Sequence, residues 1–198
     1  MLIIKHRINT VKDLMNLPKK FGAEIDIRSF NNELIINHNP FEVGTKLKEW
    51  LKFYDHNFII FNIKEEGIEF KLLELLNDFN INNYFFLDQS FPFFIKHIDL
   101  FGNKSSIRIS RYENIDRAIA LRKFTKWLWV DYFDTFPLTK YQIKDLRKFN
   151  FKFCVVSPEL VVENDINKRI IEIKDTFNES SASIDAVCTK LPYIWEKK

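Results

Sequence analysis

The sequence predicts an α/β fold, a compact (β/α)8 TIM barrel formed by one domain over residues 1–198. Short apolar runs alternate with amphipathic stretches along the whole chain, and this alternation is typical of β-α-β units on a parallel sheet. The chain has 198 residues, enough for about one domain, and no linker divides it. Eight such units close naturally into a barrel. An open doubly wound sheet is the alternative.

The predicted strands are runs rich in Ile, Val, Phe and Trp. Branched and aromatic side chains favour strands because they pack well on a pleated surface. In chain order the runs cover residues 2–7, 23–27, 58–64, 84–89, 106–110, 128–133, 151–157 and 184–189.

Between these runs apolar residues recur three and four positions apart, which predicts helices that bury one face. The helices are expected at residues 11–21, 45–54, 68–79, 115–124, 141–149 and 166–177. Thr10, with Asp13 three residues later, predicts the N-cap of the first helix. Gly22 predicts a left-handed C-cap at the end of the same helix.

The composition excludes several classes of function. Thirty Lys and Arg against 27 Asp and Glu give a net charge of +3, too little to predict a nucleic-acid partner. Four glycines, none in a phosphate-binding pattern, exclude the common nucleotide-binding loops. Two cysteines, Cys154 and Cys188, make neither a disulfide framework nor a zinc site.

No apolar stretch approaches the roughly 18 residues that a membrane-spanning helix needs. The first residues carry too short an apolar run for a signal peptide. The expectation is therefore a cytoplasmic protein without membrane insertion, and an oligomer is possible.

Polar residues gather at the predicted ends of the first three strands, where a barrel of this kind carries its site. Glu24 and Asp26 are two positions apart, so both side chains point to the same face of their strand. Two close carboxylates repel each other unless a proton or a cation intervenes, and a divalent cation with oxygen ligands would remove the repulsion. The alternative is a pair of solvated carboxylates at a sheet edge.

Two histidines lie near this pair in the predicted fold. His6 stands at the end of the first predicted strand, and His38 follows an extended run that returns after the Asn31-Asn32 turn. Histidine titrates near neutral pH and is suited to moving protons.

This set of residues resembles the glycerophosphodiester phosphodiesterase family, within the phospholipase C-like phosphodiesterases that have a TIM barrel. The resemblance covers nearly the whole chain and is strongest in the first 65 residues. It is carried there by Lys5-His6-Arg7, Gly22-Ala23-Glu24-Ile25-Asp26, His38-Asn39-Pro40 and Ile60-Phe61-Asn62-Ile63-Lys64.

The resemblance implies metal-dependent hydrolysis of a small phosphodiester substrate, and it implies a role for each matching residue. His6 and His38 would be the general acid and base. Glu24, Asp26 and Asn62 would hold a divalent cation, Mg²⁺ or Ca²⁺. Arg7 and Lys64 would bind the phosphate, because a guanidinium and an ammonium stabilise its negative charge.

Arg108 is a further candidate for a phosphate contact, because it stands near the end of the fifth predicted strand. Asp131, near the end of the sixth, is a candidate substitute metal ligand.

Some positions depart from the family's pattern. Asn62 stands where the family has a third carboxylate ligand, Asn39 stands in place of the Asp after the second His, and Lys190 replaces the Asp near the closing strand. These departures motivate a second hypothesis, a non-catalytic or weakened barrel that binds a phosphorylated ligand. A third hypothesis, a phospholyase for lipid head groups, is disfavoured because the sequence shows no amphipathic helix suited to a membrane surface.

Overall fold

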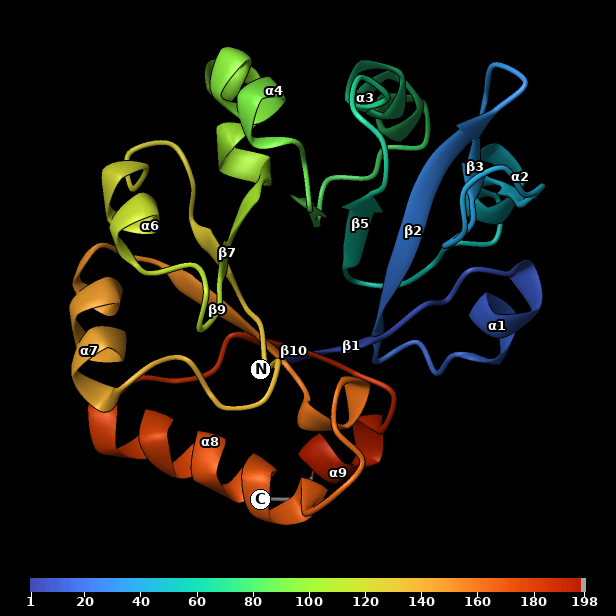
Figure 1. Cartoon of the computed structure of the whole chain (residues 1–198). Coiled ribbons are helices and arrows are strands. Elements are labelled where there is room, and N and C mark those ends of the chain that lie inside the picture. The colour runs from blue at the N-terminus through green and yellow to red at the C-terminus, as the bar shows by residue number, and fades with distance from the viewer. Residues whose placement is uncertain (197–198) are drawn as a thin grey trace. The chain divides into compact units, whose positions relative to one another are not determined.

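The computed structural model describes residues 1–196 and falls into two compact units. The N-terminal unit is Ile4–Phe101, and the C-terminal unit is Met1–Ile3 with the described residues from Gly102 onward. Each unit carries parallel strands and helices (Figure 1). The predicted α/β class is therefore confirmed, while closure into one barrel and a single domain over residues 1–198 stay predictions.

The N-terminal unit is built around a long central strand, β2, which is Gly22–Phe30. β2 pairs in parallel with β1 on one side and β5 on the other, and β5 pairs in parallel with β6. A short antiparallel extension follows the turn after β2, where β3 pairs with β2 and β4 with β3. The other strands are β1 (Leu2–Lys5), of which the last two residues belong to this unit, β3 (Glu33–Ile36), β4 (Thr45–Lys46), β5 (Ile59–Ile63) and β6 (Tyr84–Leu87).

The helices of this unit are short, apart from the third. They are α1 (Val11–Asn16), α2 (Leu47–Leu51), α3 (Glu69–Asp78), α4 (Phe91–Lys96) and α5 (Ile98–Phe101). The predicted N-cap is confirmed, since the Thr10 side chain accepts a hydrogen bond from the backbone N–H of Asp13. The predicted extent of this helix, to residue 21, is wrong. Leu17 is extended because Pro18 disfavours helical backbone at the residue before it.

The predicted C-cap role of Gly22 is also wrong, because Gly22 is the first residue of β2. A Cβ at this position would lie 2.5 Å from Cδ1 of Ile4 and 2.7 Å from the carbonyl oxygen of Phe58. The glycine therefore allows the neighbouring chain segments to approach β2 closely.

The C-terminal unit contains four parallel strands in the order β10-β9-β8-β7. They are β7 (Ser106–Ile109), β8 (Trp127–Val130), β9 (Lys152–Val156) and β10 (Ala186–Thr189). The helical segments are η1 (Gly102–Lys104), α6 (Asp116–Ala120), α7 (Lys140–Lys148), η2 (Pro158–Leu160), α8 (Ile166–Ser180) and α9 (Pro192–Glu196). Helices α7 and α8 pack against each other (Figure 1).

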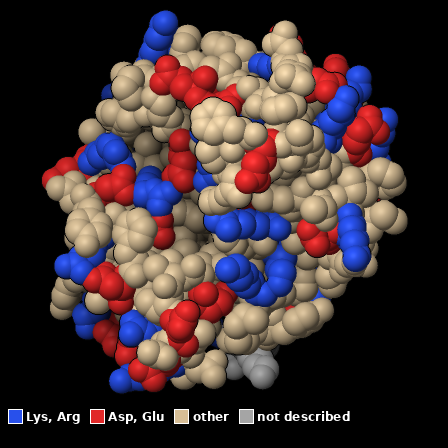
Figure 2. Space-filling view, turned by 45° about the vertical axis from the view of Figure 1, so that its right-hand side comes forward, with Lys and Arg blue, Asp and Glu red and all other residues tan. Residues whose placement is uncertain are grey.

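All eight predicted strands are present, each within a few residues of its predicted range. On the face shown in Figure 2, basic and acidic side chains are interspersed, and neither sign covers that face alone. Within residues 1–196, no helix combines the length and the apolar character needed to cross a membrane.

Candidate functional site

The strand register of the N-terminal unit explains how the predicted site residues meet. Asp26 on β2 is the register partner of Asn62 on β5, and register partners project to the same face of a sheet. Ile4 is the partner of Gly22, so His6, two residues further, is brought to the level of Glu24. Lys64 directly follows β5 and donates its backbone N–H to the carbonyl oxygen of Ile27 at 3.0 Å.

Glu24 is almost fully buried, with 1% of its surface exposed. Its Oε2 accepts a hydrogen bond from the backbone N–H of Arg7 at 2.8 Å, and its Oε1 accepts one from Asn62 Nδ2 at 3.0 Å. His6 Nε2 lies 3.9 Å from Oε2. Burial raises the pKa of Glu24 from 4.5 to about 7, and the charge of Asp26 adds to the increase. The site therefore holds a carboxyl group whose negative charge is poorly compensated.

Asp26 is also buried, but its environment is richer in positive charge. Its Oδ1 lies 3.3 Å from Lys64 Nζ and 3.3 Å from His38 Nδ1, while Arg7 Nε lies 3.7 Å from Oδ2. Burial on its own would raise the pKa of Asp26. The hydrogen bond from Asn9 and the charges of Lys64 and His38 together outweigh burial and lower it below its ordinary value. Asp26 is therefore the more readily ionised member of the carboxylate pair.

The contacts of His38 indicate which ring nitrogen carries a proton. Nδ1 faces a carboxylate oxygen of Asp26, which accepts only, and Nε2 lies 3.0 Å from Arg7 Nη2, which donates only. The neutral imidazole that satisfies both partners has its proton on Nδ1. Nε2 is then the nitrogen with a free electron pair, as a general base requires.

Asn62 is buried at 8% exposure, and its two amide atoms differ in their surroundings. Nδ2 donates to Glu24, but Oδ1 is buried and has no hydrogen-bond partner among the described residues. A buried oxygen without a donor, beside a carboxyl group of raised pKa, fits a hard cation that takes oxygen ligands. The described residues contain no group of three His, Cys, Asp or Glu side chains able to hold a metal, so Asn62 would complete the ligand set.

Two residues of this site have no role in the sequence-based prediction. Asn9 is bound twice to Asp26: its Nδ2 donates to Oδ2 at 2.9 Å, and its Oδ1 accepts from the backbone N–H at 3.1 Å. Arg28 donates to the backbone carbonyls of His38 and Lys64. Arg28 continues the alternation of Glu24 and Asp26 on one face of β2, a pattern visible in the sequence, whereas nothing in the sequence marks Asn9.

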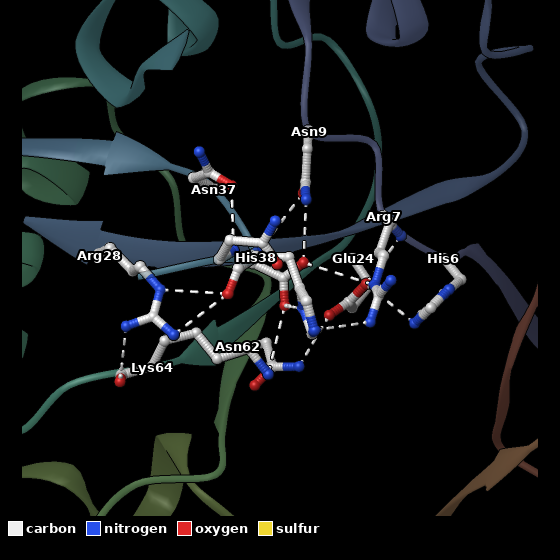
Figure 3. A network of polar contacts seen from close by, with 11 residues as sticks. His6, Arg7, Asn9, Glu24, Arg28, Asn37, His38, Asn62 and Lys64 are labelled. Carbon is white, nitrogen blue, oxygen red and sulfur yellow. Dashed lines mark hydrogen bonds and ion pairs between the residues drawn. The ribbon is translucent and has the colours of Figure 1, made fainter. Parts of the chain in front are cut away.

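Figure 3 shows the resulting arrangement, in which side chains that follow β1 and β3 meet side chains of β2 and of the end of β5. The predicted residues that the structure brings together here are His6, Arg7, Glu24, Asp26, His38, Asn62 and Lys64.

The remaining candidates lie in the C-terminal unit. The Arg108 guanidinium donates to Asp131 and lies 3.9 Å from the carboxylate of Glu113. The backbone N–H of Lys190 donates to Glu159 Oε1 at 2.9 Å. Arg108 and Asp131 are thus partners of each other, and their predicted roles toward a phosphate and a cation stay predictions.

No family model matches the sequence, and no curated protein matches it closely enough to count as a relative. Solved structures do resemble its fold. A protein described as a putative glycerophosphoryl diester phosphodiesterase from Agrobacterium tumefaciens superimposes with a TM-score of 0.65 at 11% identity, over 98% of this chain and 95% of that one.

Two other solved structures give similar values. A glycerophosphoryl diester phosphodiesterase from Parabacteroides distasonis has a TM-score of 0.63 at 10% identity, over 98% of this chain and 84% of that one. A glycerophosphodiester phosphodiesterase from Agrobacterium tumefaciens has a TM-score of 0.63 at 10% identity, over 98% of this chain and 99% of that one. The chain therefore shares the fold of these proteins.

Proposed function

We propose that this chain is a phosphoric diester hydrolase that cleaves a small glycerophosphodiester with a divalent cation and two histidines. The observation that carries the proposal is the convergence of two imidazoles and two cationic side chains on two buried carboxylates (Figure 3). The names of the structural neighbours support the same activity. The fold alone would not, because one fold hosts many functions.

His6 and His38 divide the proton transfers in this proposal. His38, held through Nδ1 by Asp26, presents Nε2 to take the proton of the nucleophile. The nucleophile would be water, or a neighbouring hydroxyl of the substrate that forms a cyclic phosphate, which water then opens. His6 lies beside Glu24, with its Nε2 3.9 Å from Oε2 of that carboxyl group. His6 would then give its proton to the departing alkoxide.

Arg7 and Lys64 would bind the phosphate. Both cations contact Asp26 in this structure, and a bound phosphodiester would compete with that carboxylate for them. The Arg7 side chain is 43% exposed, so it is free to turn from His38 toward the substrate. This movement would also release His38 Nε2 for proton transfer.

Glu24, Asp26 and Asn62 would hold the cation, Mg²⁺ or Ca²⁺. The case is strongest for Asn62, whose Oδ1 has no hydrogen-bond partner among the described residues, and for Glu24, whose pKa is raised. It is weaker for Asp26, because protein groups already surround both of its carboxylate oxygens. A divalent cation at this position would stabilise the charge that develops on the phosphate oxygens.

We propose in addition that the parallel strands of the two units complete a (β/α)8 barrel, with this site at the carboxyl ends of the strands. A cytoplasmic location and a possible oligomer are further expectations from the sequence.

A second candidate function is binding of a phosphorylated ligand without turnover. Asn62 favours it, because an amide in place of a carboxylate removes one negative charge from the cation site. Calorimetric binding of glycerol 3-phosphate, together with no release of product from any glycerophosphodiester, would identify such a protein.

The proposed activity is tested by incubating the protein with glycerophosphocholine and Mg²⁺ or Ca²⁺ and measuring the release of choline. We expect turnover that a chelator abolishes and added cation restores. If neither cation supports turnover of glycerophosphocholine, glycerophosphoethanolamine or glycerophosphoglycerol, the proposed hydrolase is excluded.

A further inference from the structure

Arg28 is a half-buried arginine of β2 that binds two backbone carbonyls of the candidate site (Figure 3). Its Nε and Nη2 donate to the carbonyl oxygen of His38 at 3.2 and 3.1 Å, and its Nη1 donates to the carbonyl oxygen of Lys64 at 3.3 Å. Among the described residues it forms no ion pair with a carboxylate. Its hydrogen bonds are thus directed at main-chain atoms of two site residues.

These two carbonyls belong to segments that need to be fixed relative to each other. His38 stands two residues beyond the end of β3, and Lys64 directly follows β5. Their side chains reach the same atom, Oδ1 of Asp26, each at 3.3 Å. A shift of either backbone would therefore move an imidazole or an ammonium away from the carboxylate.

An arginine is suited to this bridging because its donors lie in one rigid plane and point in several directions. A lysine in its place keeps the charge but offers a single ammonium on a flexible chain, which cannot reproduce the three hydrogen bonds. The guanidinium thus links the segments that follow β3 and β5, while the pairing of β2 with its neighbouring strands holds the backbone of Arg28.

We propose that Arg28 is a positioning residue, which holds the backbones of His38 and Lys64 so that both side chains converge on Asp26. Arg28 acts through these two residues and does not itself bind the phosphate. The expected loss of catalysis rests on the proposed function, whereas the expected displacement of the His38 and Lys64 side chains does not.

The catalytic consequence is tested with Arg28→Lys, and with Arg28→Gln as a second variant, on glycerophosphocholine with saturating cation. We expect kcat per folded protein to fall by about 10- to 100-fold, because a displacement of about 1 Å can cost 100-fold in rate. KM should rise as well, because the displaced Lys64 binds the phosphate in the proposed function. Wild-type kinetics in both variants would overturn the proposal, and so would a raised KM with unchanged kcat, which would show that Arg28 does not hold the His38 imidazole in place.

Arg147→Lys is the matched control, since Arg147 also bonds a backbone carbonyl, that of Ser183, and pairs with Asp185 ahead of β10. This variant should lose stability and keep kcat per folded protein. An equal loss of kcat in the control would show that the effect of Arg28 is a general structural one and would overturn the proposal.

Crystal structures of the wild type and of Arg28→Lys provide a test that does not depend on turnover. We expect the His38 ring or the Lys64 ammonium to lie about 1 Å or more further from Asp26 Oδ1 in the variant. Unchanged positions would overturn the proposal. If the wild type hydrolyses nothing, the proposed function fails, and these structures alone decide the role of Arg28.

Discussion

Raising the pH of a metal-free solution should destabilise the protein through one buried carboxyl group, that of Glu24. Burial and the neighbouring Asp26 raise its pKa from 4.5 to about 7. A carboxyl group with a raised pKa binds its proton more tightly in the folded than in the unfolded chain. Its contribution to stability is complete below pH 4.5 and is lost as the pH rises through about 7.

The size of the effect follows from the same values. Each unit of pKa difference between the folded and unfolded chain corresponds to about 1.4 kcal/mol. The rise of the Glu24 pKa from 4.5 to about 7 therefore corresponds to a loss of about 3 kcal/mol of unfolding free energy once the pH lies above both values. Unfolding free energies of domains are about 5–15 kcal/mol, so such a loss is readily measured. Asp26 contributes with the opposite sign and at lower pH, because its pKa is lowered in the folded chain. The ionised Asp26 stabilises the fold at pH values above the ordinary pKa of an aspartate, and this stabilisation is lost as the pH falls through the lowered pKa.

The assay is urea denaturation between about pH 5 and pH 8 in the presence of a chelator, with Glu24→Gln as the comparison. Burial also lowers the pKa of His56, so both proteins lose stability when the pH falls below the ordinary pKa of histidine. This loss is the same in the two proteins and cancels when their unfolding free energies are subtracted. The wild type should lose about 2–3 kcal/mol relative to Glu24→Gln as the pH rises. Added Mg²⁺ or Ca²⁺ should restore stability to the wild type. Parallel pH curves for the two proteins would refute the reasoning.

Three other predictions concern the same network. His6→Gln and His38→Gln should each lower kcat on glycerophosphocholine by about 10²–10⁴-fold, the usual cost of losing a positioned acid or base; an unchanged kcat would remove that histidine from the mechanism. Asn62→Glu should tighten Mg²⁺ and Ca²⁺ binding in calorimetry, because added ligand charge favours hard cations; an unchanged, measurable affinity would place the cation elsewhere. Asn9→Ala should lower the free energy of unfolding by about 1–3 kcal/mol, because the buried carboxylate of Asp26 and its backbone N–H each lose a hydrogen bond; a loss below about 0.5 kcal/mol in urea denaturation would contradict this.

The order of strands and helices could be predicted from the sequence, because both follow from local patterns of apolar residues. The spacing of Glu24 and Asp26 already placed both side chains on one face of a strand. The first helix shows the limit of such patterns: apolar spacing continued to Leu17 and beyond, but Pro18 ends the helix earlier. Gly22 was misplaced because a close approach between strands is invisible in one segment alone.

The charge state of the site depended on the tertiary structure. In the sequence Glu24 and Asp26 are equivalent acids, two residues apart. In the fold Asp26 contacts Lys64, His38 and Asn9. Glu24 instead accepts hydrogen bonds from two neutral donors, the backbone N–H of Arg7 and the amide of Asn62, and lies 3.9 Å from His6. Their pKa values therefore move in opposite directions.

Which residues hold the site in place was likewise decided by hydrogen bonds between distant segments of the chain. Arg28 lies 10 residues from His38 and 36 from Lys64, and Asn9 lies 17 from Asp26. The sequence alone determined which chemical groups are available and on which strands they stand. Only the tertiary structure decided which of them touch, because hydrogen bonds and desolvation act across space and not along the chain.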